Sequence, residues 1–231
     1  MQTPRAPSLL QTTLAILWKD LTIELRTREI VTTAGFFAAL VTIMASVAFY
    51  AGEDTAKRIG PGAIWLPIAF ASVLALGRSW QRERDESALT ALLVAPISRA
   101  GLFLGKAAGI FVFVLAVECI VVPLVGLMFH VELPEVLPGI VPLLLLGTLG
   151  IAATGTLFGA MTVRTRARDL VLATVLFPLL SPTLVAGISG TREVFQGYEN
   201  ADLRSYFVLL GIFDAVAVLG GVAMFGALLD D

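Results

Sequence analysis

The sequence predicts an all-α membrane protein: one bundle of six transmembrane helices, preceded by an amphipathic helix at the membrane surface. Three observations predict it, namely the composition, the length of the apolar runs and the placement of the basic residues. Hydrophobic residues make up 57% of the 231 residues, charged residues make up 15%, and the mean hydropathy is +0.89. Because soluble domains contain about 25% charged residues, lipid is the expected solvent.

Six apolar runs are long enough to cross a bilayer core, which takes about 20 residues of helix. They are apolar on every face, which favours helices over the alternating strands of a barrel, the other structure that satisfies its backbone groups in lipid. The connections are short, so residues 1–231 are expected to form one transmembrane domain. The predicted spans are 30–50, 61–80, 102–129, 136–163, 170–190 and 206–229.

The Lys and Arg residues are concentrated on one side of these spans. Twelve of the 16 lie before the first span, between the fourth and fifth, or from Arg78 to Lys106, a stretch that covers the connection between the second and third spans and the adjoining span ends. The other side holds Lys57, Arg58, Arg192 and Arg204. Because cytoplasmic segments are enriched in Lys and Arg, both termini are predicted to be cytoplasmic. The net charge of −2 gives no reason to expect a nucleic acid as a partner.

The segment before the first span, about 8–29, is predicted to be an amphipathic helix that lies in the membrane interface. Its leucines recur at spacings of three and four, whereas Asp20 and Glu24 lie off that stripe. A helix packed on another protein is the alternative. Trp18 suits the headgroup level, as do Trp65 and Trp80 near the ends of the second span. The leucine stripe consists of Leu10, Leu14, Leu17, Leu21 and Leu25.

The segment between the second and third spans combines a charged cluster with a short amphipathic helix. The charges come first, three leucines follow on one side of the helix, and Pro96 ends it because its ring cannot continue the hydrogen-bond ladder. Such a helix suits a groove on a cytosolic protein, and an ordinary positively charged loop is the alternative. The residues expected to make the contact are Arg82, Glu83, Arg84, Glu86, Leu89, Leu92, Leu93 and Pro96.

Four groups of residues, spread along nearly the whole chain, together match the pattern of one known family. They are Trp80, Arg84, Glu86, Leu89, Leu92, Leu93, Ala95 and Pro96 with Gly105-Lys106; Trp18-Lys19-Asp20 with Glu24, Arg26, Arg28 and Glu29; Gly150 to Gly159 with Thr154-Gly155-Thr156; and Phe177-Pro178-Leu179 with Ser181-Pro182. In these residues the chain resembles the CcmB family. Members of that family (haem exporter protein B) are membrane subunits of the ABC transporter of bacterial cytochrome c maturation. The family's usual glycine after the acidic cluster is replaced here by Ser87 or Ala88.

The resemblance implies a permease of the ABC-2 exporter type in the bacterial inner membrane, with one transmembrane permease domain over residues 1–231. Its ATPase would be a separate cytosolic subunit, CcmA, and segment 82–96 would be the coupling helix. The haem-handling partners would be CcmC, CcmD and the haem chaperone CcmE, whose haem-loaded form is released when ATP is hydrolysed. A second copy of the chain is a further candidate partner. An ABC-2 permease that exports a drug, lipid or polysaccharide is the alternative.

The chain shows no catalytic motif of its own, so it is expected not to be an enzyme and to bind no cofactor or metal directly. Residues Gly101 to Lys106 resemble the phosphate-loop motif of nucleotide-binding proteins. However, three residues separate the glycines where the motif needs four, and Ala107 replaces the required Ser or Thr. ATP is therefore assigned to the partner, and Lys106 is expected to extend to the inner headgroups. His130, alone at the outer end of the third span, is interpreted as an interfacial residue and not as a haem ligand.

Two acidic residues, Glu118 and Asp214, lie inside predicted spans. A charge at the bilayer centre costs about 2.5–3.5 kcal/mol on insertion scales, so both are expected to face the bundle interior, a cavity or a partner. A functional polar lining and a neutral, hydrogen-bonded carboxyl are both open interpretations. A membrane enzyme would need paired catalytic groups at this depth, and an ion-driven transporter would favour an internal repeat; the sequence shows neither pattern.

Overall fold

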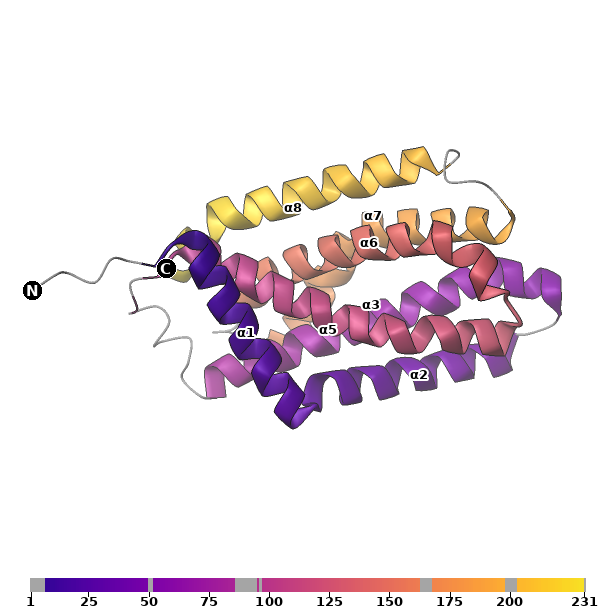
Figure 1. Ribbon diagram of the computed structural model, residues 1–231, viewed down its shortest axis with the longest axis horizontal. Coiled ribbons are helices and arrows are strands. Elements are labelled where there is room, and N and C mark those ends of the chain that lie inside the picture. Colours follow the sequence, from indigo (N-terminus) through magenta and orange to yellow (C-terminus); the bar gives the residue numbers. More distant parts are fainter. Residues whose placement is uncertain are drawn as a thin grey trace, which may run out of the picture.

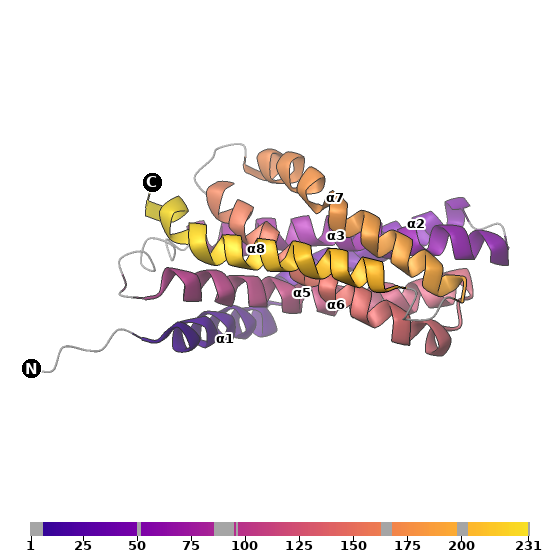
Figure 2. The same cartoon turned by 90° about the horizontal axis from the view of Figure 1, so that it is seen from above.

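The computed structural model describes residues 7–49, 52–85, 95, 97–162, 168–197 and 203–230, and every regular element among them is an α-helix. The long helices lie side by side along one axis, and α1 crosses one end of the bundle obliquely (Figure 1, Figure 2). The predicted helical bundle is thus confirmed. The helices are α1 (Leu9–Thr27), α2 (Glu29–Phe49), α3 (Glu53–Asp85), α5 (Arg99–Phe129), α6 (Leu133–Thr162), α7 (Arg168–Phe195) and α8 (Arg204–Asp230).

Six of these helices are long and apolar enough to cross a membrane, and each overlaps one predicted span. Helix α3 extends well beyond its prediction at both ends, because charged residues near Lys57 and Arg84 continue the helix after the apolar run has ended. Hydropathy therefore locates the part that crosses hydrocarbon and not the helix ends. The candidate spans are Glu29–Phe49, Lys57–Arg84, Arg99–Phe129, Leu133–Met161, Thr174–Phe195 and Arg204–Leu228.

Helix α1 confirms the predicted N-terminal helix. The side that carries its acidic residues packs on the bundle, whereas most of the leucine stripe is exposed. A capping box starts the helix: Ser8 Oγ accepts from the Gln11 N–H, and Gln11 Oε1 accepts from the Ser8 N–H. The buried side consists of Thr12, Ile16, Asp20 and Glu24, and the exposed side includes Leu10, Leu14, Trp18 and Leu25. The exposed leucines suit a helix bordered by lipid on its outer side.

Trp65 of α3 lies where α3, α6 and α7 meet. Its side chain is fully buried, and Nε1 donates a 2.9 Å hydrogen bond to Thr191 Oγ1 of α7. The indole fits because Gly147 of α6 and Gly187 of α7 face it, and a Cβ at either glycine would lie 2.5 Å from a ring carbon. Trp80 is likewise buried, against Gly159 of α6, so neither indole faces the surroundings, and their predicted place at headgroup level stays a prediction.

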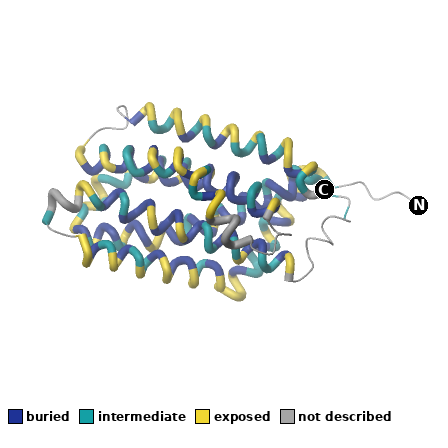
Figure 3. Tube along the Cα trace, turned by 180° about the vertical axis from the view of Figure 1, so that it is seen from behind, coloured by how far each residue is buried: buried dark blue, intermediate teal, exposed yellow. Residues whose placement is uncertain are grey.

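Helix α8 lies at the edge of the bundle and contacts it along one side. It is the uppermost helix in Figure 3, where exposed and intermediate residues cover most of its length. Its buried side within the span consists of Leu210, Asp214, Gly221 and Phe225. The rest of its apolar surface faces the surroundings, as expected of a peripheral helix in lipid.

Replacing Gly187 by valine is expected to destabilise the bundle, because the new side chain would overlap the Trp65 ring at the contact of α3 with α7. Overpacking a close-packed site costs about 1–3 kcal/mol, so the purified protein should unfold at a lower temperature in detergent. Gly211→Val on α8 is the matched control, since a Cβ there meets nothing within 4 Å. Equal melting temperatures of the two variants would contradict this role of Gly187.

Candidate functional site

Helix α1 approaches α5 closely because three glycines, Gly101, Gly105 and Gly109, recur at every fourth residue of α5. A Cβ at Gly105 would lie 2.7 Å from Ile16 Cβ, and one at Gly109 would lie 3.4 Å from a carboxylate oxygen of Asp20. Small residues at this spacing let two helix backbones meet. Gly101 and Gly105, whose spacing resembles a phosphate loop, therefore allow two helices to cross closely in the structure.

Beside this crossing lie four charged side chains, here called the charge cluster: Lys19 and Asp20 of α1, Glu83 of α3 and Lys106 of α5. Asp20, Glu83 and Lys106 are buried, and Lys19 is partly exposed. Lys106 Nζ lies 2.9 Å from Asp20 Oδ2 and 2.5 Å from Glu83 Oε1. Lys19 Nζ lies 3.0 Å from Asp20 Oδ1 and is also hydrogen-bonded to Glu83 Oε1. Each lysine thus contacts each carboxylate, and the charge cluster carries no net charge.

Lys106 does not extend to the headgroups, and that expectation is wrong. Its side chain is 2% exposed, and its Nζ lies 5.7 Å from the centre of the Trp80 ring in a cation–π contact. The physical reason is that α1 covers α5 at this point, while Asp20 and Glu83 neutralise the ammonium inside the bundle. The position of Lys106 within its own span predicts contact with the headgroups, whereas its cover by α1 arises only from tertiary packing.

The charge cluster depends on every member having an opposite charge in contact. Removing one partner of a buried pair costs about 3–5 kcal/mol, because it leaves an uncompensated buried charge. For Lys19, burial lowers the pKa, but Asp20 and Glu83 raise it by more, so the pKa lies above its usual value of 10.5. The stability that the Lys19 ammonium contributes is therefore fully present below pH 10.5, and it is lost as the pH rises above the raised pKa.

A second, more exposed group of ion pairs joins α1 and α3 to α2. Arg82 of α3 lies 3.6 Å from Glu24 of α1 and 3.4 Å from Glu29 at the start of α2. Glu24 also accepts a 2.9 Å hydrogen bond from the Val31 N–H, a donor in the first turn of α2 that has no acceptor within the helix. Arg78 pairs with Glu29 at 3.3 Å, and both of these side chains are about half exposed.

Three of the residues predicted to contact a cytosolic protein can be placed in the structure, and their environments differ. Arg82 and Glu83 belong to the ion pairs above, whereas Arg84 is exposed near the end of α3. Glu83 is 3% exposed and contacts α1 and α5, so it does not face solvent. The rest of that prediction lies outside the described residues: Glu86, Leu89, Leu92, Leu93 and Pro96.

Glu118 and Asp214 are both 4% exposed, but they lie at different helix contacts. The Thr148 hydroxyl of α6 donates to Glu118 Oε1 of α5, beside an apolar cavity of about 330 Å³ between these helices. Asp214 of α8 faces α6, where a Cβ at Gly150 would lie 2.5 Å from Asp214 Oδ1. Neither oxygen of Asp214 accepts a hydrogen bond from a described residue. The structure therefore does not bring the two acids together.

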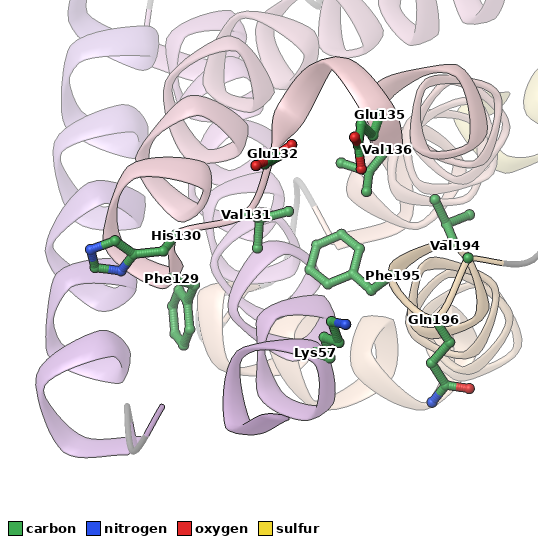
Figure 4. Close-up of a pocket in the computed structure, with 11 residues that line it drawn as sticks. Lys57, Phe129, His130, Val131, Glu132, Glu135, Val136, Val194, Phe195 and Gln196 are labelled. Carbon is green, nitrogen blue, oxygen red and sulfur yellow. The ribbon is translucent and has the colours of Figure 1, made fainter. Parts of the chain in front are cut away.

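At the other end of the bundle from α1, a cavity of about 410 Å³ lies between the start of α3, the turn from α5 to α6 and the end of α7 (Figure 4). Phe195 lies in its middle, and the His130 imidazole points away from Phe195 (Figure 4). His130 has a φ of 55° and caps α5 through a hydrogen bond from its N–H to the Gly126 carbonyl. Within the described residues, no three His, Cys, Asp or Glu side chains are grouped to hold a metal ion.

Comparison with known proteins decides the family, since the family model described as CcmB protein matches residues 11–229. The chain belongs to the CcmB family. Two proteins named heme exporter protein B are each 30% identical to it: that of Paracoccus denitrificans over 76% of this chain and 78% of the relative, and that of Bradyrhizobium diazoefficiens over 70% and 72%. Another, from Pseudomonas aeruginosa, is 24% identical over 76% of this chain and 78% of the relative.

The resemblance seen in the sequence is thereby confirmed at the level of the CcmB family. The range matched by the CcmB model contains all four members of the charge cluster and both buried acids of the spans. These residues therefore lie within the part of the chain by which family membership is recognised.

The Lys106→Ala variant of this CcmB family member is expected to lose much of its stability, because Asp20 and Glu83 would then share the single charge of Lys19. The expected loss is about 3–5 kcal/mol, as for other buried pairs deprived of one partner. Lys57→Ala is the matched control, since Lys57 is exposed at the opposite end of the bundle. Thermal unfolding in detergent checks both; a Lys106→Ala protein as stable as Lys57→Ala would show that the charge cluster does not stabilise the fold.

Proposed function

We propose that this CcmB family member is the membrane permease subunit of an ABC transporter complex for cytochrome c biogenesis in the bacterial inner membrane. The observation that carries the proposal is the family match over residues 11–229, with relatives named heme exporter protein B. Six helices able to cross a membrane fit the role of such a subunit. Haem is the proposed cargo of the complex, and no residue of this chain is assigned to bind it.

ATP hydrolysis is assigned to a separate cytosolic subunit of the CcmA type, because residues 101–106 lack the spacing of a phosphate loop. The segment from Arg82 to Pro96 is proposed to couple that subunit to the spans. The other proposed partners are of the CcmC, CcmD and CcmE type, and hydrolysis is proposed to release the haem-loaded chaperone. This chain therefore acts as a non-catalytic subunit that transmits motion.

Both termini and the coupling segment are proposed to lie on the cytoplasmic side. Twelve of the 16 Lys and Arg residues support this orientation. In agreement with it, the start of α1, the end of α3 and the end of α8 lie at the same end of the bundle (Figure 1). A partner that docks on segment 82–96 would then approach from the cytosol.

Single-cysteine variants at the two ends of α3 test the orientation. In a Cys119→Ser background, which removes the one native cysteine, a membrane-impermeant maleimide should label Lys57→Cys in intact spheroplasts. It should label Arg84→Cys after lysis only, because the two exposed residues lie at opposite ends of a candidate span. Labelling of both variants from outside would contradict the proposed topology.

The functional test uses an affinity-tagged chain in a host strain that lacks its own copy. An ATPase and haem-handling membrane proteins are expected to co-purify with the tagged chain, and covalent haem attachment to c-type cytochromes should require it. Normal c-type cytochromes in the deletion strain would refute the proposed function. If the deletion strain kept normal c-type cytochromes but no longer exported a drug, lipid or polysaccharide, the cargo would be of that class.

The leucines of segment 82–96 are expected to contribute more to binding of the ATPase than the exposed charge of Arg84 does. Burying such an anchor contributes about 1.5–3 kcal/mol, whereas an exposed ion pair contributes about 0–1 kcal/mol. The Leu92→Asp variant should therefore lose the co-purified ATPase and haem attachment, while Arg84→Ala keeps most of both. Wild-type levels of both in Leu92→Asp would show that the segment is a connector without a coupling role.

A further inference from the structure

The proposed coupling segment has two stems in the structure: the end of α3 on one side and the start of α5 on the other. Helix α3 ends at Asp85 and α5 begins at Arg99, so residues 86–98 connect the two stems. Any force that a partner applies to this connection must enter the bundle through these stems. What holds the stems therefore decides which helices respond.

Helix α1 contacts both stems. Near its start, Thr13 Oγ1 donates a 3.3 Å hydrogen bond to the Gly101 carbonyl, and a Cβ at Gly101 would lie 2.9 Å from the Leu9 carbonyl oxygen. At its middle, Lys19 pairs with Glu83 of the other stem. Because α1 is one continuous helix from Leu9 to Thr27, it bridges the two stems as a single element.

Glu83 ties the α3 stem to α1 and to α5 at the same time. Its Oε1 contacts Lys19 of α1 and lies 2.5 Å from Lys106 of α5, and its Oε2 accepts no hydrogen bond from a described donor. The side chain is buried, so moving it away from the two lysines would leave uncompensated charges inside the bundle. The charge cluster therefore resists separation of its three helices and favours their movement together.

Arg82, next to Glu83 in α3, makes a second connection between the α3 stem and α1. Arg82 pairs with Glu24, which lies further along α1, and with Glu29 at the start of α2. Two successive residues of α3 thus contact α1 at two points, Lys19 and Glu24. This arrangement fixes the α3 stem along α1 and limits its rotation about a single contact.

We propose that α1 is a clamp on the two stems of the coupling segment, with Glu83 as its positioning residue. A force applied to the segment then moves α1, α3 and α5 as a unit and is not lost in spreading the stems apart. This inference rests on the proposed function, because it assumes that an ATPase acts on the segment. It gives α1 a part in transmission in addition to its place at the membrane surface.

Glu83→Gln tests the clamp in the whole complex, because it removes the charge and keeps the shape of the side chain. The quantity to measure is covalent haem attachment to c-type cytochromes per ATP hydrolysed, at equal amounts of complex. We expect this ratio to fall by about tenfold, within the usual range of coupling between sites, while the ATPase still co-purifies and turns over. Glu83→Asp, which keeps the charge, should restore most of the ratio.

Arg78→Gln is the control, because Arg78 pairs with Glu29 in a half-exposed contact that does not involve α1. If Glu83→Gln complex does not accumulate, Arg82→Gln takes its place and should lower the ratio in the same direction. An unchanged ratio would overturn the clamp, whether complex levels are normal or reduced, since a merely structural role would lower both activities together. Failure of the wild-type chain to bring down an ATPase would instead refute the proposed function.

Discussion

The buried ammonium of Lys106 is the constraint on which the arrangement of α1 depends. An ion inside a helical bundle needs opposite charges in contact, and Asp20 of α1 and Glu83 of α3 supply them. To bring Asp20 there, α1 must turn its polar side inward and lie close to α5. The glycines of α5 permit that approach, and the exposed leucines of α1 follow as its opposite face.

The same principle of close approach recurs in the rest of the bundle. Lipid tails are as apolar as leucine, so helices in a membrane gain little from burying apolar surface and associate through packing and polar contacts. Trp65 is buried against Gly147 and Gly187 and donates a hydrogen bond to Thr191. Asp214 departs from this pattern, since its buried oxygens accept no hydrogen bond from the described residues.

The sequence predicts the number of spans, their approximate positions and the N-terminal helix, because hydropathy reports directly which residues enter hydrocarbon. It does not predict the charge cluster, since the partners Lys19 and Glu83, or Asp20 and Lys106, are far apart in sequence and meet through tertiary packing. One feature of the sequence indicates which side of α1 faces the bundle: Asp20 and Glu24 lie one turn apart, on a helix whose leucines could face lipid. The burial of Trp65 cannot be predicted from its own segment, because it depends on Gly147 and Gly187 of two other helices.

The charge cluster thus links α1, the spans and the proposed coupling segment. A double-mutant cycle with Asp20→Asn and Lys106→Met tests it most directly, through the free energy of unfolding in mixed micelles. The two residues are in contact at 2.9 Å, and contacting pairs show interaction energies of about 0.5–3 kcal/mol. If the charge cluster holds α1 in place, the coupling energy should lie in the upper half of that range. Additive effects, within about 0.5 kcal/mol, would contradict it.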